Sequence, residues 1–236
     1  MSQDKCPVFY MSHDDRGVVV FLSALGFIHT KDLSDADFVV FPGGEDVTPF
    51  LYGERKHPKT HCNLERDLKE VKLFRSLPSS LPKVGICRGA QFLNVMSGGS
   101  LWQHVDHHAT AKGHLAKDMY AKNSFFHVTS THHQMMIPGP EAAVLAAASC
   151  SEYKHGDSRV CHFPENTNDF DDPEVVYYAG TNSICYQPHP EYAGSANKAN
   201  QEFFLEVLET YVLTHSQCTA AKAVRTGRQQ QQKKDA

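Results

Sequence analysis

Short apolar runs alternate with amphipathic stretches along the first half of the chain. Residues 38–41 form a continuous apolar run, which is typical of a parallel strand that is covered on both faces. Residues 63–77 place apolar side chains on one side among many charges, which predicts a surface helix. Shorter runs predict strands at 7–11 and 27–30 with a helix between them. This alternation favours an α/β fold built on a doubly wound, mostly parallel sheet.

The second half of the chain has a less regular pattern. Short β-branched or aromatic runs predict strands at 124–129, 175–179 and 183–186. An amphipathic stretch at 197–213 predicts a last helix. Residues 151–173 contain several Asp, Asn, Gly and Pro residues, which predicts a long surface loop.

A cysteine lies between a predicted strand at 83–86 and the helix that follows it. Gly85 and Gly89 stand two residues on either side of Cys87, as a strained strand-to-helix turn around an exposed nucleophile requires. The backbone amides and the dipole at a helix N-terminus stabilise a thiolate. Cys87 is therefore a candidate nucleophile, with a buried structural cysteine as the alternative.

Two further segments that follow predicted strands carry suitable chemistry. Gly43 and Gly44 come directly after the first buried strand, where their backbone amides can stabilise an oxyanion, although a plain turn gives the same pattern. His189 and Glu191 follow the last predicted strand. Residues two apart in an extended segment point the same way, so the carboxylate can orient the imidazole.

Seven histidines between positions 104 and 133 invite interpretation as a metal site. No predicted helix carries an H-x-x-x-H pair in this segment, and no cysteine lies among these histidines. We therefore expect no metal site, and pocket-lining or exposed histidines instead. The seven are His104, His107, His108, His114, His127, His132 and His133.

Composition narrows the class of protein. The 236 residues are 41% hydrophobic, which is ordinary for a globular protein with a real core. The formal net charge of −4 provides no field that favours nucleic acid or an anionic membrane as a partner. The sequence shows no targeting pattern at its start and no apolar run long enough to span a bilayer. Seven cysteines without C-x-x-C spacing fit reduced thiols, so a cytoplasmic location is expected.

The composition changes near residue 214. Residues 1–214 are predicted to form one domain, whereas residues 215–236 are a basic, glutamine-rich tail that is predicted to be disordered. The tail either keeps the protein soluble or contacts a partner or nucleic acid. No other feature of the chain indicates nucleic-acid binding.

Four blocks of the chain together carry a specific likeness over most of residues 38–213. The blocks are Phe41 to Val47 with Pro49, Tyr52, Gly53 and Glu54; Gly85 to Gln91 with Leu93 to Val95, Gly98 and Gly99; Ser130 to Gln134; and Gln187 to Glu191. In these blocks the chain resembles the class I glutamine amidotransferase-like superfamily. Within it, the chain is similar to the peptidase C26 group, which includes gamma-glutamyl-gamma-aminobutyrate hydrolases.

The resemblance implies a flavodoxin-like, three-layer α/β/α fold. It implies a catalytic triad of Cys87, His189 and Glu191. It also implies an oxyanion hole formed by the backbone of Gly44 and Arg88.

The implied reaction is hydrolysis of glutamine or of a γ-glutamyl amine through a γ-glutamyl thioester, without a metal or an organic cofactor. Two alternatives stay open. The first alternative is a glutaminase subunit that feeds ammonia to a separate synthetase. The second is a non-enzymatic binding module of the same fold. The substrate-binding residues that the resemblance implies are Gly43, Gln91, His132 and His133.

Two features depart from the family pattern. The N-terminal section is shorter than in the hydrolases, and an acidic loop at 151–173 replaces a tight turn. Because this loop precedes the strands that deliver His189, we expect its carboxylates to attract an amine-bearing leaving group, unless they only keep the surface soluble. The leaving group and the oligomeric state do not follow from the sequence. The acidic residues are Glu165, Asp169, Asp171, Asp172 and Glu174.

Overall fold

The computed structural model describes most of the chain before residue 214. The predicted tail at 215–236 lies outside the described part, as does much of the predicted loop at 151–173. The described residues are 6–122, 124–149, 151, 153–156, 160–162, 171–194 and 197–213.

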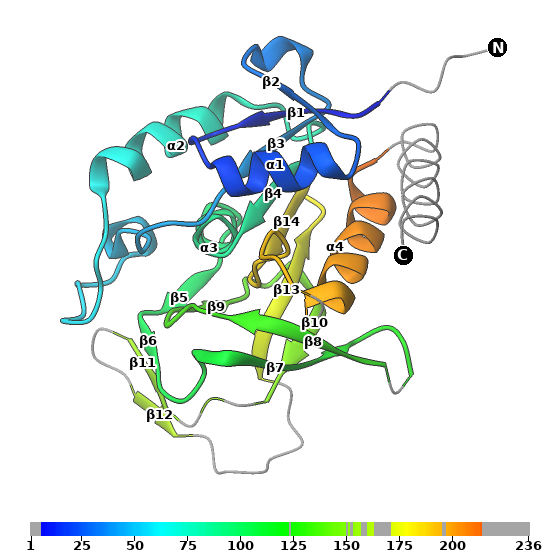
Figure 1. Cartoon of the computed structure of the whole chain (residues 1–236). Coiled ribbons are helices and arrows are strands. Elements are labelled where there is room, and N and C mark those ends of the chain that lie inside the picture. The colour runs from blue at the N-terminus through cyan, green and yellow to red at the C-terminus, as the bar shows by residue number, and fades with distance from the viewer. Residues whose placement is uncertain are drawn as a thin grey trace.

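A nine-stranded sheet forms the centre of the molecule, with the strand order β2-β1-β3-β4-β14-β13-β10-β7-β8 (Figure 1). The first five strands in this order are parallel, and four antiparallel strands extend the sheet beyond β14. The parallel strands are β1 (Val8–Met11), β2 (Ile28–Thr30), β3 (Phe38–Phe41), β4 (Lys83–Ile86) and β14 (Ser183–Tyr186). The antiparallel strands are β7 (Thr110–Asp118), β8 (Phe125–Ser130), β10 (Ala142–Ala148) and β13 (Asp172–Tyr178).

Two pairs of helices cover opposite faces of the parallel strands. α1 (Arg16–Ala24) and α4 (Lys198–Tyr211) contribute side chains to one hydrophobic core. α2 (Leu64–Ser76) and α3 (Arg88–Met96) contribute to a second core on the other face. This arrangement confirms the predicted three-layer α/β/α architecture. Within the described ranges, no helix has both the length and the apolar character that crossing a membrane requires.

The continuous apolar run of β3 is explained by its place between these two layers. Phe38 and Val40 belong to the core beneath α1 and α4, whereas Val39 and Phe41 belong to the core beneath α2 and α3. Successive side chains of a strand point to opposite faces, so a strand covered on both faces needs apolar residues at every position.

The helix predicted at 63–77 is confirmed in position, but the predicted inward face is wrong in part. Leu64 and Leu68 are 48% and 53% exposed, whereas the charged residues Arg66, Asp67 and Glu70 are buried. Burial of charge is tolerated here because these side chains form ion pairs with each other and with an arginine of α3. α2 therefore presents a charged face to the interior.

The prediction of one unbroken loop at 151–173 is also wrong. β11 and β12 lie inside this interval, and β13 begins at Asp172. Strands of three residues have too few positions to show a periodicity, and β11 pairs with a strand that is distant in sequence. The smaller elements are β5 (Ser100–Trp102) paired with β9 (Met135–Ile137), the sheet of β6 (His104–Val105), β11 (Tyr153–His155) and β12 (Val160–His162), and the 3-10 helices η1 (Leu33–Asp35) and η2 (Pro49–Tyr52).

We expect Gly89→Ala to destabilise the fold by at least about 2 kcal/mol, because the new Cβ would overlap the Phe41 carbonyl oxygen of β3. Gly180→Ala is the matched control, since the nearest atom to its Cβ is a Glu141 carboxylate oxygen at 3.5 Å. Chemical denaturation of both variants measures the difference. Equal stabilities for the two variants would contradict the close packing of α3 on β3.

Candidate active site

Three neighbouring parallel strands end at the same edge of the sheet, and each leads to residues predicted from the sequence. β3 leads to Gly43 and Gly44, β4 leads to Cys87, and β14 leads to His189. The carboxyl ends of parallel strands meet at one edge, so the three segments converge there. The strand order β3-β4-β14 therefore brings together residues that are far apart in the chain.

Cys87 occupies a strained turn between β4 and α3. It is the N-terminal cap of α3, with φ 52° and ψ −109°, a conformation that costs a non-glycine residue about 1–3 kcal/mol. A Cβ on Gly85 would overlap the backbone of Gly89, so only glycine permits this approach of helix and strand. The backbone N–H of Cys87 donates to the carbonyl of Tyr186 on the neighbouring strand at 2.9 Å. The backbone around Cys87 therefore has the strained strand-to-helix turn that the sequence predicts.

His189 contacts both Cys87 and Glu191. Its Nδ1 lies 2.5 Å from Oε1 of Glu191, and its ring lies close enough to Cys87 for the thiol to act on its pKa. Burial by itself lowers the pKa of His189, but the hydrogen bonds with Cys87 and Glu191 outweigh burial and raise the pKa to about 11. A protonated imidazole is therefore favoured beside the cysteine.

The segment that carries His189 is fixed by hydrogen bonds from elsewhere in the chain. The backbone N–H of His189 donates to Oγ1 of Thr129 at 2.7 Å. Asn197 donates through Nδ2 to the carbonyls of His189 at 3.0 Å and of Tyr192 at 2.9 Å. The ring of Tyr192 stacks on the imidazole, with centroids 4.4 Å apart and planes within 6°. These contacts hold the imidazole in one orientation.

A buried ion-pair cluster lies beside the elbow. The guanidinium of Arg88, the residue after Cys87, pairs with the carboxylates of Asp67 and Glu70 on α2. Asp67 also accepts from the backbone N–H of Thr48 at 2.8 Å. The two terminal nitrogens of Arg88 are thus occupied by α2, and its backbone amide is the group that the predicted oxyanion hole requires.

Arg66 holds the loop that follows β3. Its Nη2 donates to the carbonyls of Pro42 at 3.1 Å and of Gly43 at 3.0 Å. A Cβ on Gly44, whose φ is +142°, would overlap the guanidinium of Arg66. Neither Arg66 nor the acids of α2 were predicted from the sequence. The available signal was that these charges share one face of the helix at spacings of three and four residues.

A cavity of about 220 Å³ adjoins Cys87. Six of the predicted site residues line it, and Gly43 lies instead between the side chains of His189 and Cys87. A Cβ at position 43 would lie 3.1 Å from Cε1 of His189, so this position needs a glycine. The six lining residues are Gly44, Cys87, Arg88, Gln91, His132 and His133.

The polar residues of the cavity wall are held by other protein groups. Gln91 donates through Nε2 to the side chain of Gln187 at 3.1 Å and to the carbonyl of Gln134 at 3.2 Å. His133 Nε2 lies 3.2 Å from Oδ1 of Asp46. The wall is therefore preorganised.

The histidine-rich segment separates into two groups in the tertiary structure. His133 lines the cavity, and its Nδ1 lies 3.3 Å from Nδ1 of His104. His108, His114 and His132 gather instead around Glu174. The expectation of pocket-lining or exposed histidines is wrong for His108, which is fully buried. The sequence shows nothing of this grouping because the histidines come from different strands and loops.

The acidic residues at the end of the predicted loop do not form an exposed surface. Asp172 is buried and pairs through Oδ1 with Nζ of Lys154 at 2.7 Å. Glu174 is buried and pairs through Oε1 with Nε2 of His114 at 2.7 Å. The expectation that these two carboxylates attract a substrate amine is wrong, because neither reaches solvent. Two of the other acids lie outside the described residues.

Solved structures share the fold over nearly the whole chain. A glutamine amidotransferase from Thermotoga maritima superposes with a TM-score of 0.55 at 13% identity, covering 93% of this chain and 94% of that chain. A protein from Thermoplasma acidophilum, described as a candidate GMP synthase subunit, gives 0.58 at 15% identity, covering 94% and 98%. At such identities the likeness shows the fold alone.

Sequence comparisons are more specific. A candidate glutamine amidotransferase of Mycobacterium tuberculosis is 44% identical over 80 residues, which make up 33% of this chain and 26% of that protein. The chain spans about a third or less of the length of curated relatives such as this one. The sequence profile of peptidase C26 matches residues 15–153, which is more than half of the chain. The chain therefore belongs to the peptidase C26 family, within the class I glutamine amidotransferase-like superfamily.

Proposed function

We propose that the chain is a cysteine-dependent hydrolase of γ-glutamyl amides. It acts on glutamine or a γ-glutamyl amine and releases glutamate together with ammonia or the amine. The observation that carries this proposal is the contact of His189 with both Cys87 and Glu191 at the N-terminus of α3. This arrangement contains a nucleophile, a proton carrier and a group that orients the carrier.

The reaction proceeds in two steps. The Cys87 thiolate attacks the δ-carbonyl carbon of the γ-glutamyl group, and the backbone amides of Gly44 and Arg88 stabilise the resulting oxyanion. The C–N bond then breaks, and His189 gives its proton to the departing amine, which leaves a γ-glutamyl thioester. His189 next removes a proton from water. The hydroxide releases glutamate from the thioester and regenerates the thiolate.

The cavity supports a small γ-glutamyl substrate. Its volume of about 220 Å³ suits a group of amino-acid size. Glu45 and Asp46 add carboxylates to its wall, which suits the α-ammonium of a γ-glutamyl group. A hydrogen bond to its own backbone N–H contributes most to lowering the pKa of Glu45, so this carboxylate is ionised. Gln91, His132 and His133 complete the proposed contacts with the substrate.

A second candidate function is a glutaminase subunit that passes ammonia to a separate synthetase. The observation that favours it is the fold likeness to a protein described as a GMP synthase subunit. The two functions share the chemistry at Cys87. They differ in whether the isolated chain turns over substrate without a partner.

The deciding assay measures glutamate and ammonia release by the isolated protein with glutamine, and glutamate and amine release with a series of γ-glutamyl amines. We expect turnover that Cys87→Ala abolishes and that Glu191→Gln lowers by at least about tenfold, because Glu191 only orients the base. Undiminished hydrolysis by Cys87→Ala would refute covalent catalysis. Turnover of glutamine only after addition of a synthetase would favour the second function.

We expect the imidazole of His189 to titrate near pH 11, and below its ordinary value in Cys87→Ala,Glu191→Gln, which lacks both partners and leaves only the effect of burial. Because the folded-state pKa lies above the unfolded value of about 6.5, protonated His189 stabilises the fold fully below that pH. This contribution is lost as the pH rises through about 11. NMR titration of the ring nitrogens measures the pKa. A His189 pKa near 6.5 in the wild-type protein would contradict the interaction of the imidazole with Cys87 and Glu191.

We expect Arg66→Lys to lower kcat by about tenfold with a smaller change in KM, because lysine cannot hold both carbonyls of the loop after β3. Lys69→Ala on the same helix is the control, since Lys69 forms only an exposed pair with Glu65. Steady-state kinetics and thermal midpoints of both variants separate positioning from folding. Equal kcat values for the two variants would contradict a role for Arg66 in positioning the loop after β3.

A further inference from the structure

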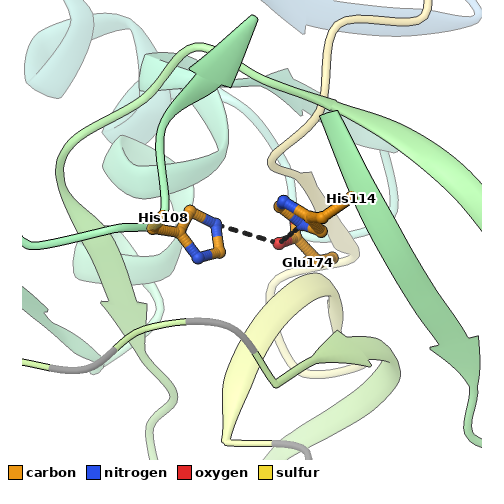
Figure 2. Close-up of side chains that lie close together, drawn as sticks. All are labelled: His108, His114 and Glu174. Atoms are coloured by element: carbon orange, nitrogen blue, oxygen red, sulfur yellow. Dashed lines mark hydrogen bonds and ion pairs between the residues drawn. The ribbon is translucent and has the colours of Figure 1, made fainter. Parts of the chain in front are cut away.

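Four polar side chains, three of them buried, converge behind the cavity wall that His132 helps to form. His108 lies between β6 and β7, His114 is on β7, His132 follows β8, and Glu174 is on β13. The residues His108 and Glu174 are 0% exposed, and His132 is 4% exposed. Figure 2 shows His108 and His114 with ring nitrogens directed at the carboxylate of Glu174. Of the four, only His132 has a part in the proposed function, as a substrate contact; His108, His114 and Glu174 have none.

The donor atoms have the spacing of a metal site. One ligand atom each from His108, His114 and Glu174 lies within 4.8 Å of the others. Nε2 of His114 is 2.7 Å and Nε2 of His108 is 3.2 Å from Oε1 of Glu174. Nε2 of His132 is 3.2 Å from Nε2 of His108 and 3.9 Å from Oε2 of Glu174. Bonds of about 2.0–2.1 Å in a tetrahedral zinc site place ligand atoms about 3.3 Å apart.

Polar groups lie behind the rings of His132 and His108, on the side away from Glu174. Nδ1 of His132 lies 2.9 Å from the carbonyl oxygen of Gln134, which can only accept, so His132 carries its proton on Nδ1. Nδ1 of His108 lies 3.3 Å from Oδ2 of Asp172 and 3.1 Å from Oγ of Ser151. A carboxylate behind a histidine is the usual support of a metal ligand.

The Nε2 lone pair of His132 therefore faces Nε2 of His108 at 3.2 Å, and Nε2 of His108 lies beside the carboxylate of Glu174. Two ring nitrogens and a carboxylate this close together need a proton or a cation between them. A cation that accepts all three imidazoles and the carboxylate satisfies the ring nitrogens that face Glu174 together with the carboxylate itself. Nitrogen donors with one carboxylate, in a closed set of four, suit zinc.

We propose that His108, His114, His132 and Glu174 bind one divalent transition-metal ion, with zinc the best match. The four protein ligands leave no position open for water, so the ion is structural. It joins the loop before β7, β7 itself, the cavity wall at His132 and β13. The carbonyl of Glu174 also accepts from the backbone N–H of Gln187 at 2.8 Å, two residues before His189. The ion thus fixes two segments that border the candidate active site.

This proposal departs from the expectation, based on sequence spacing, that the chain has no metal site. That expectation relied on helical H-x-x-x-H pairs. The ligands come instead from strands and loops that only the antiparallel half of the sheet brings together.

The test is zinc binding by the full-length protein without an affinity tag, measured by elemental analysis and by competition with a chromophoric chelator. We expect one zinc ion per chain in the wild-type protein. His114→Ala should lower the affinity by about 100-fold or more. Zinc should raise the thermal midpoint of the metal-free wild-type protein and leave that of His114→Ala unchanged. Glu174→Gln, which preserves size, is the second variant in case His114→Ala fails to fold.

His104→Ala is the matched control. His104 lies in the other histidine group, with Nε2 at 2.9 Å from Oδ1 of Asp106, and should leave zinc affinity within about twofold. Zinc binding that His104→Ala removes and His114→Ala retains would overturn the assignment. Failure of the wild-type protein to bind zinc more tightly than His114→Ala would also overturn it, and would identify the cluster as a protonated ion-pair network.

Discussion

Close backbone packing between α3 and the ends of β3 and β4 is the constraint on which the candidate site depends. Gly89 lies against the carbonyl of Phe41, and Gly85 lies against Gly89. Side chains at either glycine would push the helix away from the sheet. With the helix at this distance, the connecting residue Cys87 must take a positive φ, so the thiol stands at the N-terminus of α3 and at the edge of the sheet. The strain is local, and the surrounding packing holds it.

Charge is buried on both sides of this elbow, and partners compensate for its desolvation. Arg88 and the acids of α2 neutralise one another, and Arg66 fixes the loop that carries Gly44. Removing one member of such a cluster leaves an unpaired buried charge, so the cluster specifies one arrangement more than it adds stability. On the other side, His189 holds its proton because its hydrogen bonds with Cys87 and Glu191 outweigh the effect of burial on its pKa. Both sets of charges keep the reacting groups in fixed positions.

The antiparallel half of the sheet shapes the site from behind. β8 and the turn that follows it supply His132 and His133 to the cavity wall, and Thr129 to the backbone of His189. β13 lies beside β14, and its Glu174 reaches the segment before His189 through the main chain. One of the clustered histidines, His132, therefore lines the same cavity as Cys87. Their proposed ion would stabilise the wall and the base-bearing segment together.

The sequence by itself determined the parallel strands, the helix positions and the elbow at Cys87, because these features depend on neighbouring residues. Alternation, caps and glycine spacing are properties of neighbouring residues. The same local rules placed Gly44 and His189 after strands, so their convergence followed from the parallel order. The tertiary structure alone decided the inward charged face of α2, the short strands within 151–173 and the grouping of His108 with Glu174. Each of these features depends on partners that are distant in sequence. A short-range pattern does not show which distant charged residue will pair with a buried charge.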